Sequence, residues 1–161
     1  MVTSLEVTRA FGVRGAIALP FHPSHLARLE VDRVVEAEFT SLDNLKHRAE
    51  EVAEARTAFT VFHDMNPALC FGVTPYWPGM AEAWMIPSQY ALNRGLRLTR
   101  GAKRFFDTIG PALGLRRLQI VVCVDREKAV SWAEFLRFER EGLMRKYGPE
   151  GSDYYMYART Y

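Results

Sequence analysis

The chain has 161 residues, of which 48% are hydrophobic and 25% charged, and its formal net charge is +2. These values are those of an ordinary globular protein, so we expect a single domain over residues 1–161. No apolar run approaches the length of a membrane span, and the N-terminus lacks the regions of a signal peptide. We therefore expect a cytoplasmic protein with no membrane contact. The small net charge does not imply a nucleic-acid partner, and we expect none.

Two short strand-like pieces open the chain, at residues 5–8 and 16–19. A helix follows from Pro23 or Ser24, with Leu26, Leu29 and Val34 along it. The next helix is better defined, because Ser41 suits an N-cap and Leu42, Leu45, Ala49, Val52 and Ala53 recur at helical spacing.

The period then changes to that of strands. Residues 58–62, 68–73 and 80–86 are strand-like, and turn residues separate them at 64–67 and 75–79. Three strands in series predict an antiparallel meander.

Residues 90–113 form the longest helical pattern, which Gly114 is well placed to cap. One face is apolar, with Leu98, Ala102, Phe105 and Ile109. Another is basic, with Arg94, Arg97, Arg100 and Lys103. The basic face is open to two interpretations: a solvated surface, which we favour, or a contact with phosphate or an acidic protein surface.

The last third reads as a buried strand (120–124), an amphipathic helix through Ala129, Trp132 and Leu136, and a hairpin of strands at 142–147 and 153–161. Its tyrosines pack a terminal hairpin or serve an interface; they are Tyr147, Tyr154, Tyr155, Tyr157 and Tyr161. The order β-α-α-β-β-β-α-β-α-β-β predicts one mixed α/β (α+β) domain around a sheet of about seven strands.

Cysteine and histidine usage gives no strong signal for a metal or a disulfide. Cys70 and Cys123 lie in apolar runs without CxxC spacing, so buried reduced thiols are the simplest interpretation, although a disulfide between them stays open. His22 and His25 could face the same way, but no third ligand has a recognisable spacing. We expect no metal.

The element order and the segment 120–147 resemble the GNAT superfamily of acetyl-CoA-dependent N-acetyltransferases. The family pattern after the fifth strand is roughly Asn-x-x-Ala-x-x-x-Tyr-x-x-x-Gly-Phe, an acidic residue and Gly. Ala129, Phe138, Glu141 and Gly142 match it. Within the superfamily, AEAWMIPS, AVSWAEFLRFEREG and YGPEGSDYYMY are most similar to GNAT-like proteins of tailed bacteriophages.

The resemblance implies a site for acetyl-CoA before the third family helix and a general base on the fourth strand. The implied cofactor-binding residues are Arg94, Gly95, Arg97, Arg100, Gly101 and Ala102, although the glycines do not have the family spacing. Glu82 stands where the family often places a base, but an exposed strand residue is the interpretation that we favour from the sequence. Ala133 replaces the family's proton-donating Tyr, and Arg126 and Arg137 replace its Asn and Gly.

Two hypotheses follow. The first, which we favour from the sequence, is a GNAT-fold protein with weak or lost activity that binds a protein partner or forms part of a phage particle, in the host cytoplasm or in the virion, with no cofactor. The second is an active N-acetyltransferase that uses acetyl-CoA and acylates an amine by direct attack. The oligomeric state does not follow from the sequence.

Overall fold

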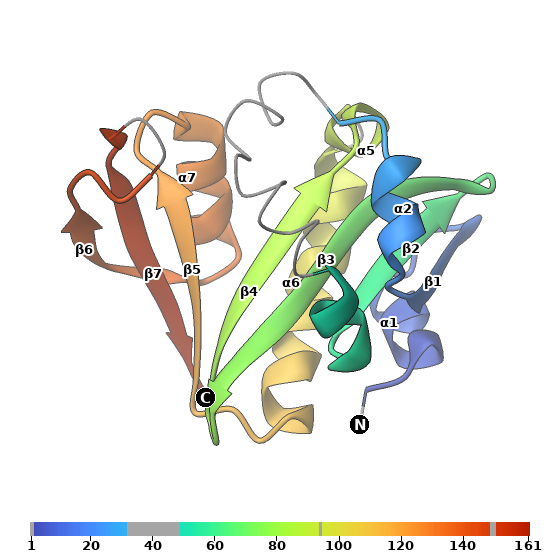
Figure 1. Ribbon diagram of the computed structural model, residues 1–161, viewed down its shortest axis with the longest axis horizontal. Coiled ribbons are helices and arrows are strands. Elements are labelled where there is room, and N and C mark those ends of the chain that lie inside the picture. Colours follow the sequence, from blue (N-terminus) through green and yellow to red (C-terminus); the bar gives the residue numbers. More distant parts are fainter. Residues whose placement is uncertain (1, 32–48, 94, 149–150) are drawn as a thin grey trace.

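The computed structural model describes residues 2–31, 49–93, 95–148 and 151–161, without the side chains of residues 95–98 (Figure 1). The elements are α1 (Ser4–Phe11), β1 (Ala16–Pro20), α2 (Pro23–Ala27), β2 (Ala58–His63), β3 (Asn66–Trp77), β4 (Met80–Pro87), α5 (Gln89–Leu92), α6 (Gly95–Ala112), β5 (Arg117–Cys123), α7 (Glu127–Phe135), β6 (Glu139–Met144) and β7 (Tyr154–Thr160). Residues 49–54 are also helical.

The strands form a seven-stranded mixed sheet in the order β1-β2-β3-β4-β5-β7-β6. Neighbours pair antiparallel except β4 and β5, which are parallel. The predicted meander and the predicted mixed α/β domain with seven strands are therefore confirmed. No helix within the described parts of the chain is long and apolar enough to cross a membrane.

Helices lie on both faces of the sheet (Figure 1). On one face α1, α6 and α7 bury the main core, in which Phe105, Leu118, Leu136 and Tyr157 take part. On the other face, α2 and residues 49–54 cover a smaller core that includes Cys70 and Ile86. We call the first the helix face and the second the front face. Successive strand residues point to opposite faces, so the register assigns each side chain to one of them.

The strand predicted at residues 5–8 is wrong, because this segment lies within α1. Thr3 and Glu6 form a capping box, in which the Glu6 N–H donates to Thr3 Oγ1 (3.3 Å) and the Thr3 N–H donates to Glu6 Oε2 (2.7 Å). Gly12 ends the helix with φ 56°. Val7 and Phe11, four residues apart, are buried in the main core. Capping and packing therefore outweigh the strand preference of Val7 and Thr8.

Other boundaries also differ from the prediction. The helix predicted for residues 90–113 is divided into α5 and α6, and Gly114 follows with φ 63°, as its capping role requires. The helix begun by Pro23 is only five residues long, and the His22 side chain caps it. Val34, Ser41, Leu42 and Leu45 lie outside the described residues. The predicted strand–helix–hairpin order of the last third is confirmed.

Candidate functional site

A wedge opens in the middle of the sheet between β4 and β5. The two strands pair only through Met80–Arg117, Ala81–Leu118 and Glu82–Gln119, and then diverge (Figure 1). Beyond this point, the edges of residues 83–87 and 120–123 do not pair with each other. A parallel sheet normally continues its ladder, so the wedge leaves backbone donors and acceptors inside the fold for another molecule.

A carboxylate stands at the vertex of this wedge, on the front face. Gln119, whose side chain is 9% exposed, donates from Nε2 to Glu82 Oε2 at 2.9 Å. This bond fixes one carboxylate oxygen and leaves the other available. Among the ion pairs of the described residues, none includes Glu82. Within the described residues, the vertex therefore carries an oriented negative charge that no cationic side chain pairs with.

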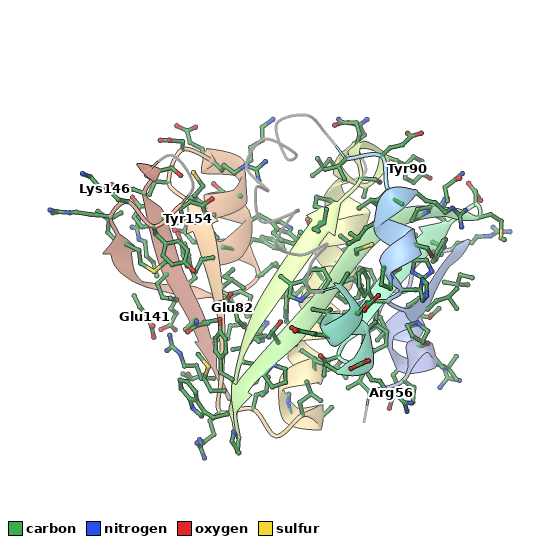
Figure 2. The ribbon with its side chains drawn as sticks, viewed as in Figure 1. Arg56, Glu82, Tyr90, Glu141, Lys146 and Tyr154 are labelled. Carbon is green, nitrogen blue, oxygen red and sulfur yellow. The ribbon has the colours of Figure 1, made fainter. Side chains whose placement is uncertain are left out.

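A second carboxylate on the same face has the opposite character. Arg117 donates to both oxygens of Glu141, at 2.8 and 2.6 Å. The hydrogen bonds from Arg117 lower the pKa of Glu141, which the positive charge reinforces. Glu141 is thus already matched by its own guanidinium, and Figure 2 shows it on the β6 side of Glu82. Of the two, Glu82 is the group that remains to accept a proton or bind a cation.

Trp84 follows Glu82 on the same face of β4. Its Nε1 is buried and, as far as the described residues extend, has no hydrogen-bond partner. The ring lies edge-on to Phe21 with centroids 5.8 Å apart, and it packs closely over Gly72, where a Cβ would approach to 2.9 Å. A buried indole N–H normally has an acceptor, so Trp84 offers a donor beside the vertex.

The open end of the wedge leads to α5 and α6. Ser88 caps α5 by accepting from the Ala91 N–H at 3.2 Å, and α6 begins at Gly95. The N-terminus of a helix favours an anion because its first N–H groups have no partner within the helix. This is where the sequence predicted a phosphate cradle, and Gly95 does lie in the first turn of α6.

The other predicted cofactor-binding residues differ in their exposure. Arg94 and the side chain of Arg97 lie outside the described part. Arg100 is exposed. Gly101 and Ala102 are buried, and a Cβ at Gly101 would collide with the Phe11 ring. Their positions indicate helix packing between α1 and α6 rather than contact with a phosphate.

The Tyr position of the family pattern is part of the core. Ala133 is 0% exposed and belongs to the main cluster on the helix face. Its neighbour Trp132 donates from Nε1 to Thr99 Oγ1 at 2.9 Å, which ties α7 to α6. Among the described residues, no tyrosine of α7 therefore supplies a proton to the wedge.

Two side-chain clusters and two hollows lie elsewhere. The Tyr90 hydroxyl and the Asp64 carboxylate both approach His63 Nδ1, at 2.8 and 3.0 Å, and so link α5 to the β2–β3 turn. His25 bonds to Thr60 at 2.9 Å, and no group of three metal-binding side chains occurs among the residues described. Hollows of about 310 and 420 Å³ share Thr57 and Leu113 in their linings.

Sequence reasoning found Glu82 but missed Gln119 and Trp84. Gln119 was recognisable as a lone amide in the apolar run Leu118–Ile120, where a buried polar group needs a partner. The identity of that partner depends on the register of two strands far apart in the chain. The orphaned Nε1 of Trp84 has no signal in the sequence.

No protein-family model matches the sequence, and no curated protein matches it. Solved structures do match the fold. The chain is similar to a GNAT-family acetyltransferase from Bacillus anthracis (TM-score 0.72, 15% identity, 91% of this chain and 95% of that chain). It is also similar to Ard1 from Thermoplasma volcanium (TM-score 0.72, 11% identity, 91% and 97%). A third match is a microcin C7 self-immunity acetyltransferase in complex with acetyl-CoA and AMP (TM-score 0.69, 12% identity, 97% and 95%).

These likenesses extend over nearly the whole chain at low sequence identity, so they identify the architecture. The resemblance to tailed-phage proteins stays a prediction. The chain has the fold of the GNAT acetyltransferases.

Proposed function

We propose that the protein is an acetyl-CoA-dependent N-acetyltransferase in which Glu82 accepts a proton from the amine. One observation carries the proposal: the sheet opens into a wedge at the residue pair where Gln119 orients the Glu82 carboxylate. The solved complex of a similar fold with acetyl-CoA supports the choice of acyl donor. Fold alone would not decide the activity, and the placement of Glu82 supplies the chemical argument.

The chain's own groups fit such a donor. The unpaired edges of residues 83–87 and 120–123 offer N–H and C=O groups to the amides of a pantetheine arm. The N-terminus of α6 offers N–H groups to phosphates. Acetyl-CoA, when bound, supplies an acetyl thioester at which a C–N bond replaces the C–S bond.

Glu82 serves the acceptor side of the reaction. A primary amine in water is mostly an ammonium ion, which must lose a proton before its lone pair can attack. Gln119 holds the Glu82 carboxylate at the vertex, where an ammonium would form a charge-assisted hydrogen bond. The balance is an ammonium and a thioester giving an amide, a thiol and one proton, which leaves through Glu82.

The competing hypothesis is a GNAT fold that has lost catalysis. It rests on Ala133, which cannot donate a proton, and on the bulky residues between Gly95 and Gly101 in the first turns of α6. We favour activity because the base position is kept and oriented, whereas a proton for the thiolate can come from water. A role with a protein partner or in a phage particle stays a prediction of the sequence.

Calorimetric titration of the purified chain with acetyl-CoA tests the proposal, followed by mass spectrometry of a panel of primary amines. We expect micromolar binding and an amine product 42 Da heavier (about one acetyl group), formed in proportion to the enzyme. Silence at millimolar acetyl-CoA would establish the competing hypothesis. Binding without a product from any amine would show a protein that binds the donor but does not transfer its acetyl group.

A further inference from the structure

The front face of the last three strands carries apolar side chains that join neither core. Gln119 points to this face, so Val121 does too, and the register places Met156 opposite Val121 and Met144 opposite Tyr154. We call Val121, Met144, Tyr154 and Met156 the apolar platform. Figure 2 shows Tyr154 on the β6–β7 side of Glu82.

The other face of the same strands is packed differently. Ile120, Val122, Tyr155 and Tyr157 belong to the main core or lie against it. The platform residues are partly exposed, and neither hydrophobic cluster of the described residues includes them. The two faces therefore differ in role: one buries the core, and the other presents an apolar surface beside Glu82.

The loop after β6 completes the platform with Tyr147. The Lys146 N–H donates to Asp153 Oδ1 at 2.8 Å, and the Gly148 N–H donates to the Ser152 carbonyl at 2.9 Å. The Tyr147 and Tyr154 rings lie 5.5 Å apart at an angle of 59°. Burial and then the nearby Glu82 carboxylate raise the pKa of Tyr147. The loop thus holds the Tyr147 ring against Tyr154 of the platform.

Charge selects the kind of acceptor. At the vertex, Glu82 attracts a single cation, because Glu141 is already neutralised by Arg117. Farther out, the platform is apolar, and Lys146 lies exposed beyond Met144. A molecule with a second positive charge would place that charge against the apolar side chains of the platform, at a cost in desolvation. The surface suits one ammonium group on an apolar body.

Spacing gives the size of that body. Val121 is two residues from Gln119, and Cys123, which pairs with Tyr154, is four. At about 3.4 Å per residue, the platform extends from roughly 7 to 14 Å beyond the vertex. An aromatic ring joined to an amine by a two-carbon chain spans the first part of this distance.

We propose that the apolar platform binds the aromatic or aliphatic body of a primary-amine acceptor whose ammonium group lies at Glu82. The proposal rests on the proposed function for its chemistry, but binding of the amine does not require acetyl-CoA. Contact with the platform, rather than a second charge, selects the acceptor, so an arylalkylamine is preferred to a polyamine or an amino sugar.

The test compares 2-phenylethylamine, spermidine and glucosamine as acceptors, by kcat/KM from product mass spectrometry. We expect 2-phenylethylamine to be preferred by at least about tenfold, as burial of a ring on apolar side chains implies. Met156→Ser should raise its KM about tenfold and leave kcat nearly unchanged. Leu143→Ser, an equal loss on the helix face of β6, is the matched control and should leave KM within about twofold.

Preference for spermidine or glucosamine, or equal effects of Met156→Ser and Leu143→Ser, would overturn the platform while leaving the proposed function in place. Val121→Thr, which keeps the shape of the side chain, carries the test if Met156→Ser does not fold. Saturation-transfer NMR with 2-phenylethylamine alone separates the two proposals. Suppose that 2-phenylethylamine contacts the protein, that Val121→Thr weakens this contact, and that the protein does not bind acetyl-CoA. This result would support the proposed role of the platform and refute the proposed acetyltransferase activity.

Discussion

Replacing Glu82 by Gln tests the chemistry most directly. The substitution keeps the size of the side chain, and its amide oxygen can still accept from Gln119 Nε2. It removes the charge and the ability to take a proton. We expect the fold to persist, because the bond at the vertex is kept and no ion pair of the described residues involves Glu82.

The magnitude follows from the role. A positioned general base contributes about 10²–10⁴-fold, which at about 1.36 kcal/mol per tenfold is roughly 2.7–5.4 kcal/mol in the transition state. We therefore expect kcat/KM for the best amine of the panel to fall by that factor in Glu82→Gln. The assay is product mass spectrometry at several pH values, since the pH dependence that the base imposes should also disappear.

Glu141→Gln is the matched control on the same face. It breaks the exposed ion pair with Arg117, for which about 0–1 kcal/mol of stability is expected. Its kcat/KM should stay within about threefold of the parent, because Arg117 already neutralises Glu141. If Glu82→Gln keeps more than about a third of the activity, or falls no further than the control, Glu82 is not the base.

Three further changes probe packing and titration. Gly101→Val should destabilise the fold by about 3 kcal/mol in urea unfolding, because the new side chain collides with Phe11. Trp132→Phe removes the hydrogen bond from Trp132 Nε1 to Thr99 Oγ1, which joins α7 to α6. If this hydrogen bond lies beside the acetyl-CoA site, the affinity for acetyl-CoA, measured by calorimetry, should change. Burial raises the pKa of Cys70 from 9.0 to about 11. The stability that the protonated thiol contributes is therefore fully present below pH 9 and falls as pH rises towards 11, by up to about 3 kcal/mol.

Each of these has its own comparison. Gly142→Ala meets nothing within 4 Å and should be nearly neutral, so an equal loss there would remove the packing argument for Gly101. Cys70→Ala should flatten the difference in stability between pH 9 and 11, and an unchanged slope would assign it to other groups. An unchanged affinity for acetyl-CoA in Trp132→Phe would show that the Trp132–Thr99 hydrogen bond lies away from the acetyl-CoA site.

Local patterns predicted the sheet well. The segments 58–62, 68–73 and 80–86 have the residue spacing of strands and are bounded by turn residues. These two local features are enough to predict that they form strands. The same holds for Gly114, whose left-handed conformation a helix end requires. The strand prediction at residues 5–8 failed because a capping box and the packing of Phe11 outweighed the preferences of individual residues.

The site was predicted less completely, because it depends on the register of distant strands. Glu82 could be named from its strand, but only the pairing with Gln119 shows that its carboxylate is oriented and lies where the sheet opens. Gly101 shows the opposite case. The family resemblance placed Gly101 at a phosphate site, which stays a prediction, and the structure adds a packing reason for this glycine, the close approach of the Phe11 ring.

The proposed general base, Glu82, and the missing general-acid Tyr at position 133 would act on barriers of different height. An amine with a pKa near 10.4 must lose its proton at pH 7, and this difference of about 3.4 pH units corresponds to roughly 4.6 kcal/mol. A thiol with a pKa near 8.5 leaves as the thiolate, and its difference of about 1.5 pH units corresponds to roughly 2 kcal/mol. Glu82 addresses the larger of these two barriers, and a Tyr at position 133 would address the smaller. On the proposed function, Ala133 therefore lowers the rate that we expect, and the activity that we propose is that of a slow transferase.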